Sequence, residues 1–157
     1  MVMKKCCGVL RIAVGLIVLG LLLAGSANAA TLTVCPSGCA YSSIQKAINA
    51  SSNGDTILVK SGTYFENVNV TKQLMLHGIG NPVVDAGGSG SAITLSANGI
   101  RLEGFTATGG GDYYYYDSPE AGIKVSSSNN TLSGNIASNN YEGISLRKTK
   151  SVIHFFF

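Results

Sequence analysis

A repeat in the second half of the chain limits the folds open to it more than any other feature. Segment 92–104 aligns with segment 122–134, so that Ile93 matches Ile123 and Leu102 matches Leu132. A third copy begins at Gly143, which matches Gly122. The first step along the repeat is nine positions longer than the second, and we attribute this difference to an insertion at about 109–119. The underlying period is then about 21 residues, in the range of solenoid repeats.

A period in the low twenties without helices is typical of a β-solenoid. Each coil supplies two or three short strands, and successive coils stack about 4.8 Å apart through parallel backbone hydrogen bonds. A leucine-rich repeat would need a longer apolar signature, and a β-sandwich gives no reason for the repeat. The residues expected to point inward are Ile93, Leu95, Leu102, Ile123, Val125, Leu132, Ile144 and Leu146. The residues expected at corners are Asn130, Asn139 and Asn140.

Segment 1–29 has the order of parts of a secretory signal peptide. Lys4, Lys5 and Arg11 form a basic start, segment 12–24 is an uncharged apolar run, and segment 27–29 gives an Ala-x-Ala cleavage pattern. The apolar run is shorter than the roughly 20 residues that cross a bilayer as a helix. An uncleaved anchor is the alternative. We expect an exported protein, secreted or at the cell surface, with no membrane segment after cleavage.

Charge gives no reason to expect a nucleic-acid partner. The chain has 11 basic and 8 acidic residues, but three of the basic residues lie in the leader. Eight residues of each sign therefore remain in the mature part, whereas nucleic-acid-binding domains carry a clear basic excess. We expect neither nucleic acid nor anionic membrane as a partner of the mature chain.

Cys35 and Cys39 are the two cysteines that remain after the leader. No histidine lies near them and no second cysteine pair exists, so a four-ligand zinc site cannot be assembled locally. A small disulfide loop suits an exported protein. His77 and His154 are the only histidines, too few for a copper site of several imidazole or sulfur ligands. We expect a Cys35–Cys39 disulfide, no metal site and no cofactor.

The start of the mature chain predicts a cap for the solenoid. Segment 42–50 forms a short amphipathic helix in which Ser42 and Gln45 match a capping box. Such a helix can cover the lower end of a stack of coils, as terminal caps do in repeat proteins. We place the cap, with the disulfide loop, at 30–54 and the coils at 55–146.

The pattern stops after Leu146. Segment 147–157 shows neither a corner Asn nor the coil spacing, and it ends in three phenylalanines. We interpret this tail as the product of a frameshift or of a truncated reading frame, with a genuine C-terminal strand as the alternative. Roughly three to four coils remain, near the minimum for a stable solenoid.

Several segments resemble pectin-lyase-like right-handed β-helix proteins. Those that resemble their N-terminal cap and first coils are 43–48, 54–59, 62–68 and 74–80. Those that resemble the coils of NosD-type proteins, the carbohydrate-binding and sugar-hydrolase-associated repeats of archaeal and bacterial cell surfaces, are 129–136 and 143–146. The resemblance implies an all-β, right-handed parallel β-helix with a short N-terminal capping helix. It implies less about function, because this scaffold hosts many activities.

Enzymes of that superfamily use carboxylates that this chain does not obviously provide. Pectin methylesterases use paired aspartates with an arginine, and pectate lyases use clustered aspartates that hold calcium beside a basic residue. Arg101 and Glu103 lie two apart on a predicted strand and so share an outer face, where a surface ion pair is the simpler interpretation. Asp112, Asp117 and Glu120 flank the insertion and are either calcium ligands or solvated loop acids.

The candidate carbohydrate-binding or partner-binding residues are Tyr113, Tyr114, Tyr115 and Tyr116. Tyrosine faces with polar tips suit sugar or protein contacts, and the alternative is that they cover apolar surface of the coil. We expect a secreted or cell-surface, non-catalytic β-helix module that contacts a polysaccharide or another cell-envelope component. The alternative is a polysaccharide lyase or carbohydrate esterase of the pectin-lyase-like superfamily, or an inactive fragment of one.

Overall fold

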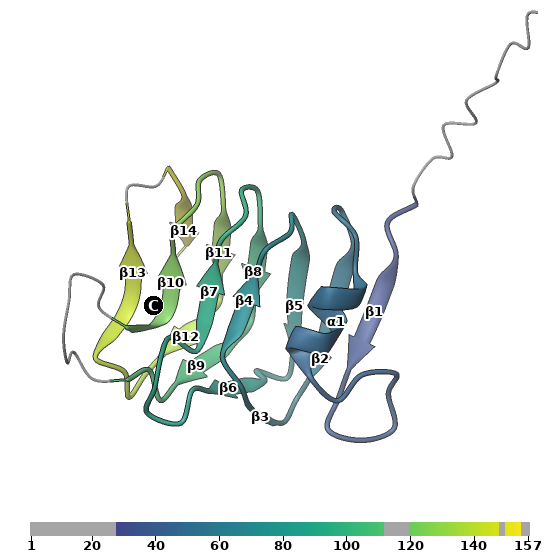
Figure 1. Cartoon of the computed structure of the whole chain (residues 1–157), viewed down its shortest axis with the longest axis horizontal. Coiled ribbons are helices and arrows are strands. Elements are labelled where there is room, and N and C mark those ends of the chain that lie inside the picture. The colour runs from purple at the N-terminus through teal and green to yellow at the C-terminus, as the bar shows by residue number, and fades with distance from the viewer. Residues whose placement is uncertain (1–27, 112–119, 148–149, 155–157) are drawn as a thin grey trace, which may run out of the picture.

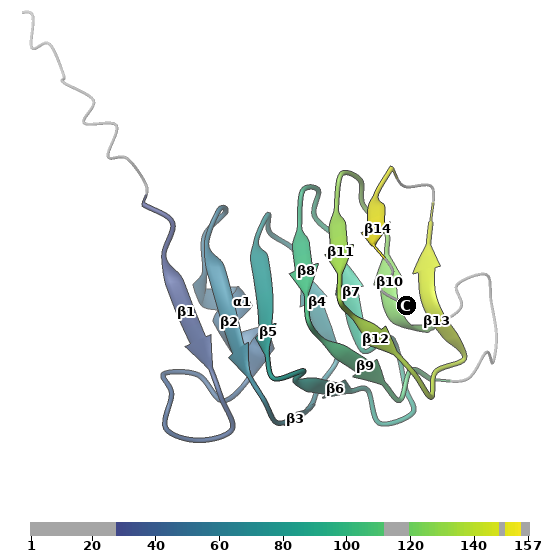
Figure 2. The same ribbon diagram turned by 180° about the vertical axis from the view of Figure 1, so that it is seen from behind.

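The computed structural model describes residues 28–111, 120–147 and 150–154, and these wind through three parallel sheets (Figures 1 and 2). In spatial order, sheet A contains β1 (Thr31–Val34), β2 (Thr56–Lys60), β5 (Met75–Ile79), β8 (Arg101–Glu103), β11 (Thr131–Ser133) and β14 (Val152–His154). Sheet B contains β3 (Thr63–Phe65), β6 (Val83–Asp85), β9 (Thr106–Thr108) and β12 (Ile136–Ala137). Sheet C contains β4 (Val68–Val70), β7 (Ile93–Leu95), β10 (Ala121–Val125) and β13 (Glu142–Leu146). With helix α1 (Ile44–Ala50) at its start, the predicted right-handed parallel β-helix is confirmed.

The offsets of the sequence repeat are strand registers in the structure. β7 pairs with β10 so that Ile93 lies opposite Ile123, and β10 pairs with β13 so that Ile123 lies opposite Ile144. Between β8 and β11, Leu102 lies opposite Leu132. The insertion therefore falls between β9 and β10 without shifting the pairing of the strands on either side.

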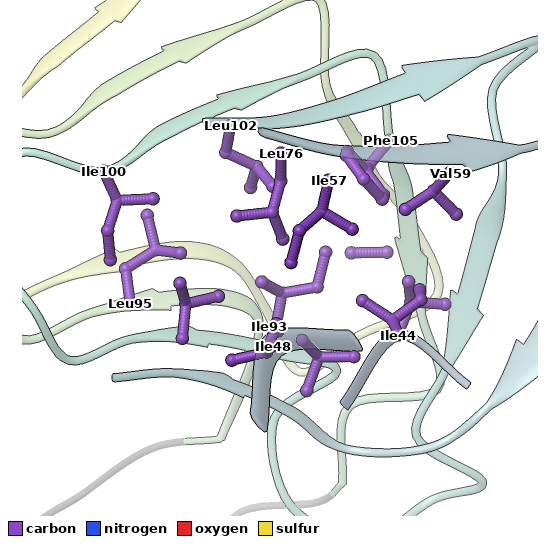
Figure 3. Close-up of a cluster of buried hydrophobic side chains, with 14 of the residues drawn as sticks. Ile44, Ile48, Ile57, Val59, Leu76, Ile93, Leu95, Ile100, Leu102 and Phe105 are labelled. Carbon is purple, nitrogen blue, oxygen red and sulfur yellow. The ribbon is translucent and has the colours of Figure 1, made fainter. Parts of the chain in front are cut away.

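The interior of the coil is a continuous column of apolar side chains (Figure 3). Sheet A contributes Ile57, Leu76 and Leu102, which lie in register on consecutive strands and are fully buried. Burial of such side chains is the main favourable term in folding. The expected inward residues that are buried are Ile93, Leu95, Leu102, Ile123, Val125 and Leu132.

The last coil departs from this expectation. Ile144 is half-buried, and the side chain of Leu146 is 49% exposed. Leu146 lies opposite Val125 in the parallel register, so its orientation in the strand is the expected one. β13 is the end strand of sheet C. The exposure of Leu146 therefore comes from its place at the end of the stack and not from a shift of register.

The tail also differs from the prediction. β14 pairs in parallel with β11, and Ile153 lies opposite Leu132 of the coil before it. Ile153 is half-buried against the apolar core. The expectation that the coil spacing stops after Leu146 is therefore wrong for segment 152–154. The corner before β14 contains no Asn, which is why the spacing was not visible in the sequence.

Corners stack in the left-handed backbone region. Asn129 and Asn139 have φ values of 60° and 55°. Each occupies the corner that a glycine with a similar φ occupies one coil earlier, Gly99 at 72° and Gly109 at 68°. Asn and Gly adopt this region at low cost. The prediction of a corner at Asn139 is confirmed, whereas at the other predicted corner the left-handed residue is Asn129, one position before Asn130.

Three asparagines spaced five apart join the last two complete coils through their side chains. Each Oδ1 accepts a hydrogen bond from the backbone amide 30 residues earlier, and the distances are 2.8 Å, 3.0 Å and 2.8 Å. These acceptors belong to Asn130, Asn135 and Asn140. Because the amides lie at corners, outside the strand ladders, the side chains satisfy donors that the sheets leave free.

Helix α1 covers the N-terminal end of the solenoid and is held there by side chains of the first solenoid coil. Its N-cap is Ser43, whose Oγ accepts from the amide of Lys46. The Glu66 carboxylate accepts hydrogen bonds from the Ile44 amide at 2.7 Å and from the Ser43 hydroxyl at 2.8 Å. The predicted capping box of Ser42 and Gln45 is therefore wrong: the N-cap is Ser43, and the Glu66 carboxylate, from outside the helix, binds its first turn.

The other end of α1 is held by Lys72. Its Nζ donates to three carbonyls at the end of the helix, those of Ile48, Asn49 and the C-cap Ser51. Between the two ends, the Gln45 side chain accepts from the Asn69 amide and donates to the Asn69 carbonyl. Gln45 thus pairs with the edge of β4 as a neighbouring strand would, so the cap leaves fewer backbone groups open at this edge.

Candidate binding groove

A groove of about 390 Å³ lies on the outer face of sheet A, across β8, β11 and β14. These strands lie side by side in Figure 2. Their middle residues, Leu102, Leu132 and Ile153, point into the coil, so the residues on either side of them point outward. The groove is lined by Arg101, Glu103, Thr131, Ser133, Gly134 and His154.

The parallel registers place these side chains in rows. His77 of β5 lies opposite Glu103, Glu103 lies opposite Ser133, and Ser133 lies opposite His154. Four consecutive strands therefore present an imidazole, a carboxylate, a hydroxyl and a second imidazole in one line. Arg101 begins the parallel row beside them, opposite Thr131.

The Glu103 carboxylate lies between the Arg101 guanidinium and the His77 imidazole. Its Oε2 lies 3.4 Å from Nη2 of Arg101 and 3.7 Å from Nδ1 of His77. The Arg101 contact confirms the expected ion pair on a shared outer face. This pair is partly exposed and so contributes little to stability. The Arg101 side chain is 55% exposed and the Glu103 side chain 32%, so both can meet a ligand.

Two polar atoms in this row lack a hydrogen-bond partner. The Oγ of Ser133 and the Nδ1 of His77 are buried and make no hydrogen bond within the described part of the chain. Buried polar atoms usually have such a partner. Ser133 lies in the wall of the groove, and its hydroxyl is covered there without a hydrogen-bond partner among the described residues.

The described lining of the groove contains one carboxylate. Of the carboxylates that the structure describes, Glu103 alone lines the groove, whereas glycoside or ester chemistry on such a face uses two. Among the described residues, no three His, Cys, Asp or Glu side chains come together as metal ligands. The described groove therefore offers donors and acceptors for hydroxyl groups, without a paired carboxylate or a metal centre.

Other carboxylates of the described residues are bound to the fold itself. Asp55 accepts from the amides of Ala30 and Ser52, and these hydrogen bonds lower the pKa of its carboxyl group. Asp85 accepts from the amide of Gly87 at 2.8 Å. Each thus supports a turn or a chain end.

The candidates at the insertion are only partly described. Tyr113, Tyr114, Tyr115 and Tyr116, with Asp112 and Asp117, lie outside the described residues. Glu120, the third candidate calcium ligand, accepts from the Ser91 hydroxyl at 2.8 Å, and that hydroxyl also accepts from the Ala121 amide. Glu120 therefore has a role in joining two coils next to the insertion.

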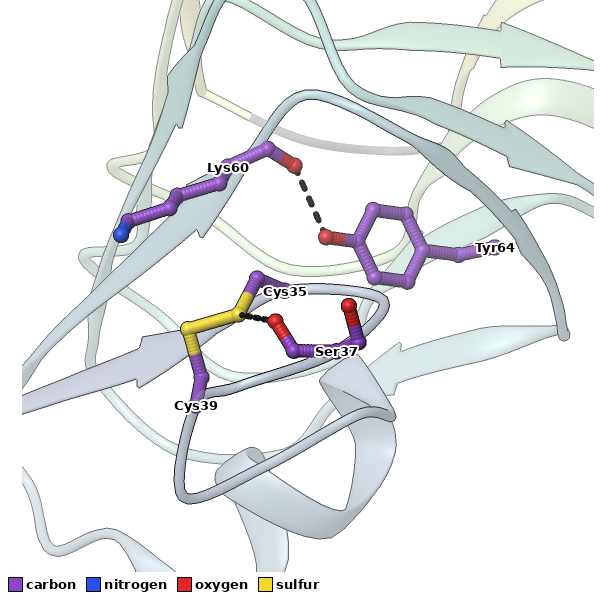
Figure 4. Close-up of a disulfide and its surroundings, with 5 residues drawn as sticks. All are labelled: Cys35, Ser37, Cys39, Lys60 and Tyr64. Carbon is purple, nitrogen blue, oxygen red and sulfur yellow. Dashed lines mark hydrogen bonds between the residues drawn. A yellow bond between two sulfur atoms is a disulfide. The ribbon is translucent and has the colours of Figure 1, made fainter.

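The structure contains the Cys35–Cys39 disulfide at the N-terminal end (Figure 4). The loop it closes packs against the first coil, because a side chain at Gly62 would meet Pro36 at 2.5 Å. Nearby, the hydroxyl of the buried Tyr64 donates to the Lys60 carbonyl at 2.8 Å. Burial, together with the charge of Glu66, raises the pKa of Tyr64.

The groove contains residues that sequence reasoning did not select. The repeat already aligns Glu103 with Ser133, and one further coil leads from Ser133 to His154. His77 lies opposite Glu103, but the coil from His77 to Glu103 differs in length from the coil from Glu103 to Ser133. The repeat offsets could have found Ser133 and His154, but His77 needs the register of the structure.

Comparison with known proteins agrees with the fold and gives a coarse functional class. No family model matches the chain. A cell surface glycoprotein of the archaeon Methanothermus fervidus is 34% identical over 98 residues, which cover 60% of this chain and 16% of that protein. The chain is thus similar to a cell-surface protein, and the match covers about one sixth of that protein's length.

Among solved structures, a pectin methylesterase in complex with a hexasaccharide superposes with a TM-score of 0.57. The superposition covers 73% of this chain and 45% of that chain, at 19% sequence identity. This likeness shows the fold alone: a parallel β-helix of the pectin-lyase-like type. Within the described residues, no helix has the length and apolar character needed to cross a membrane.

Proposed function

We propose that this chain is an exported, cell-surface β-helix module that binds a neutral glycan of the cell envelope in the groove on sheet A, without catalysis. The signal-like leader and the similarity to a cell surface glycoprotein support the location. The observation that carries the proposal is the Arg101–Glu103 pair, which lines the groove and is partly exposed there.

The chemistry of the groove favours a neutral sugar over an acidic one. Arg101 and Glu103 bring one charge of each sign, and their donors and acceptors match the neighbouring hydroxyls of a sugar ring. An acidic polymer would place its carboxylates near Glu103, where like charges repel. The partner expected from this geometry is an uncharged polysaccharide.

Binding can be tested with the exported protein on immobilised dextran, galactan and mannan, with polygalacturonate as the acidic comparison. The double variant Arg101→Gln with Glu103→Gln is expected to weaken retention on the best neutral polymer about tenfold, because it removes about 1.4 kcal/mol or more of charge-assisted hydrogen bonding. Thr106→Ala, an outward change on sheet B, is the matched control and should leave retention unchanged. Equal retention of the double variant and the parent would overturn the role of the groove.

The four tyrosines of the insertion are a second proposed contact. The insertion joins β9 to β10, hence sheets B and C, whereas the groove lies on sheet A. The two contacts can therefore be separated by substitution. Replacement of Tyr113, Tyr114, Tyr115 and Tyr116 by Ser is expected to lower retention in addition to the groove variant. Unchanged retention would remove the tyrosines from the proposal.

The alternative function, a polysaccharide lyase or carbohydrate esterase, has a direct test. Pectin and polygalacturonate are incubated with the protein, with and without calcium, and release of unsaturated products or methanol is measured. The non-catalytic proposal expects no product above a heat-inactivated sample. Turnover that Glu103→Gln abolishes would contradict it.

A further inference from the structure

The first residue expected after the leader, Ala30, lies against a buried carboxylate. Segment 28–30 is exposed and outside regular structure, as a cleavable bond requires. The backbone nitrogen of Ala30 donates to Oδ1 of Asp55 at 2.7 Å. The Ala30 carbonyl accepts from the Thr56 amide at 2.8 Å, so Ala30 is held on both sides.

Asp55 is buried, with 7% of its surface exposed. Its second oxygen, Oδ2, accepts from the Ser52 amide at 2.7 Å. A buried carboxylate normally has a cation beside it. The positive charge of Lys72 lowers the pKa of Asp55, but the Lys72 Nζ is hydrogen-bonded to carbonyls at the end of α1 and not to Asp55. Within the described chain, the hydrogen bonds of the Asp55 carboxylate therefore come from two amides and from no ammonium.

Removal of the leader changes the chemistry of this contact. Hydrolysis of the Ala29–Ala30 bond by a signal peptidase consumes one water, leaves a carboxylate on Ala29, and leaves an amino group on Ala30 that takes up a proton at neutral pH. The atom that gains the positive charge is the one that already lies 2.7 Å from Asp55. We propose that Asp55 is the receptor of the processed N-terminus, and that cleavage converts an amide hydrogen bond into a buried ion pair.

This ion pair would secure the edge of sheet A. Ala30 immediately precedes β1, the first strand, which pairs with β2 beside Asp55. Charge-assisted hydrogen bonds are about twice as strong as neutral ones. The processed chain is thus more stable at its first coil than the precursor, which links export to the stability of the folded module. The inference rests on the export that forms part of the proposed function.

The test compares two purified chains, one that begins at Ala30 and one that begins at Asn28 and so keeps an amide at Ala30. The Ala30 chain is expected to unfold about 3 °C higher at pH 7 and low salt. Asp55→Asn, made in both chains, should abolish this difference even though it lowers both midpoints. The difference should also vanish between about pH 9 and 10, where the α-amino group has lost its proton.

Equal midpoints with Asp55 present, or a difference that survives Asp55→Asn, would overturn the ion pair. Intact-mass analysis of the exported protein tests the expected cleavage position. A mature chain that begins at Ala30 is the expected result, and a different first residue would overturn the assignment of Asp55 as receptor. Neither outcome depends on glycan binding, so failure of the groove and failure of this inference can be told apart.

Discussion

The two ends of the solenoid are built differently. At the N-terminal end, α1 covers the coil and its ends are bound by Glu66 and Lys72. At the other end, the last described coil leaves its inward-facing side chains only partly covered: Ile144 and Ile153 are half-buried, and Leu146 is 49% exposed. The comparison teaches that stability in this molecule depends on position along the stack, because a coil is buried only when something packs on both of its sides.

The largest expected effect comes from matched leucines in the two regions. Leu102→Ala in the middle of the stack should destabilise the protein by about 3 kcal/mol, because the side chain is fully buried and leaves a cavity. Leu146→Ala at the end of the stack should cost less than about 1 kcal/mol. Urea unfolding measures both. Similar costs at the two positions would contradict the proposed difference between the ends.

The next effect concerns the start of α1. Glu66→Gln removes the charged acceptor of the Ile44 and Gln45 amides and of the Ser43 hydroxyl. We expect a loss of about 2 kcal/mol, since hydrogen bonds to charged groups are the strong ones. Glu142→Gln, the same change in β13 at the open end, is the control and should cost less than about 0.5 kcal/mol. If both changes had the same cost, the cap would not depend on Glu66.

A smaller effect is expected at the end of α1. Lys72→Met keeps the aliphatic stem and removes the ammonium that binds three carbonyls. Loss of these contacts should cost about 1 kcal/mol in urea unfolding. Lys60→Met, an exposed lysine at the end of β2, is the comparison and should be neutral. A neutral Lys72→Met would show that water replaces the ammonium at no cost.

The smallest effect is a dependence on pH at Asp55. Hydrogen bonds from Ser52 and Ala30, with the charge of Lys72, lower the pKa of this carboxyl. A lowered pKa stabilises the fold above the ordinary carboxyl value of about 3.9, and this stabilisation is lost as pH falls through the folded-state pKa. Thermal midpoints should therefore fall more steeply below about pH 4 in the parent than in Asp55→Asn. Parallel curves would contradict the assignment.

The regular part of the molecule was predictable from the sequence, for a physical reason. Residues that stack in a coil must share size and polarity with the residue one period away, so the match of Ile93 with Ile123 and of Leu102 with Leu132 already contains the register. The two-residue alternation of a strand led to the outer-face pair of Arg101 and Glu103. Where one coil repeats another, sequence alone predicts structure.

The parts that do not repeat were predicted less well. Local spacing favours Ser42 as the cap, but Glu66 binds the helix from the bend between β3 and β4, 21 to 23 residues away, which spacing within the helix cannot reveal. β14 was missed because its corner lacks the Asn and Gly signals. The place of His77 opposite Glu103, beside the groove, was missed because its coil differs in length from the one that follows.

Amide hydrogen exchange, read by mass spectrometry on the exported protein, tests the contrast between the two ends most directly. The account predicts slow exchange in β2, β5 and β8, which have paired strands on both sides beneath the capped end, and fast exchange in β12, β13 and β14. Slow exchange in β12, β13 and β14 equal to that in β2, β5 and β8 would show that the stack is closed at both ends and would contradict the account.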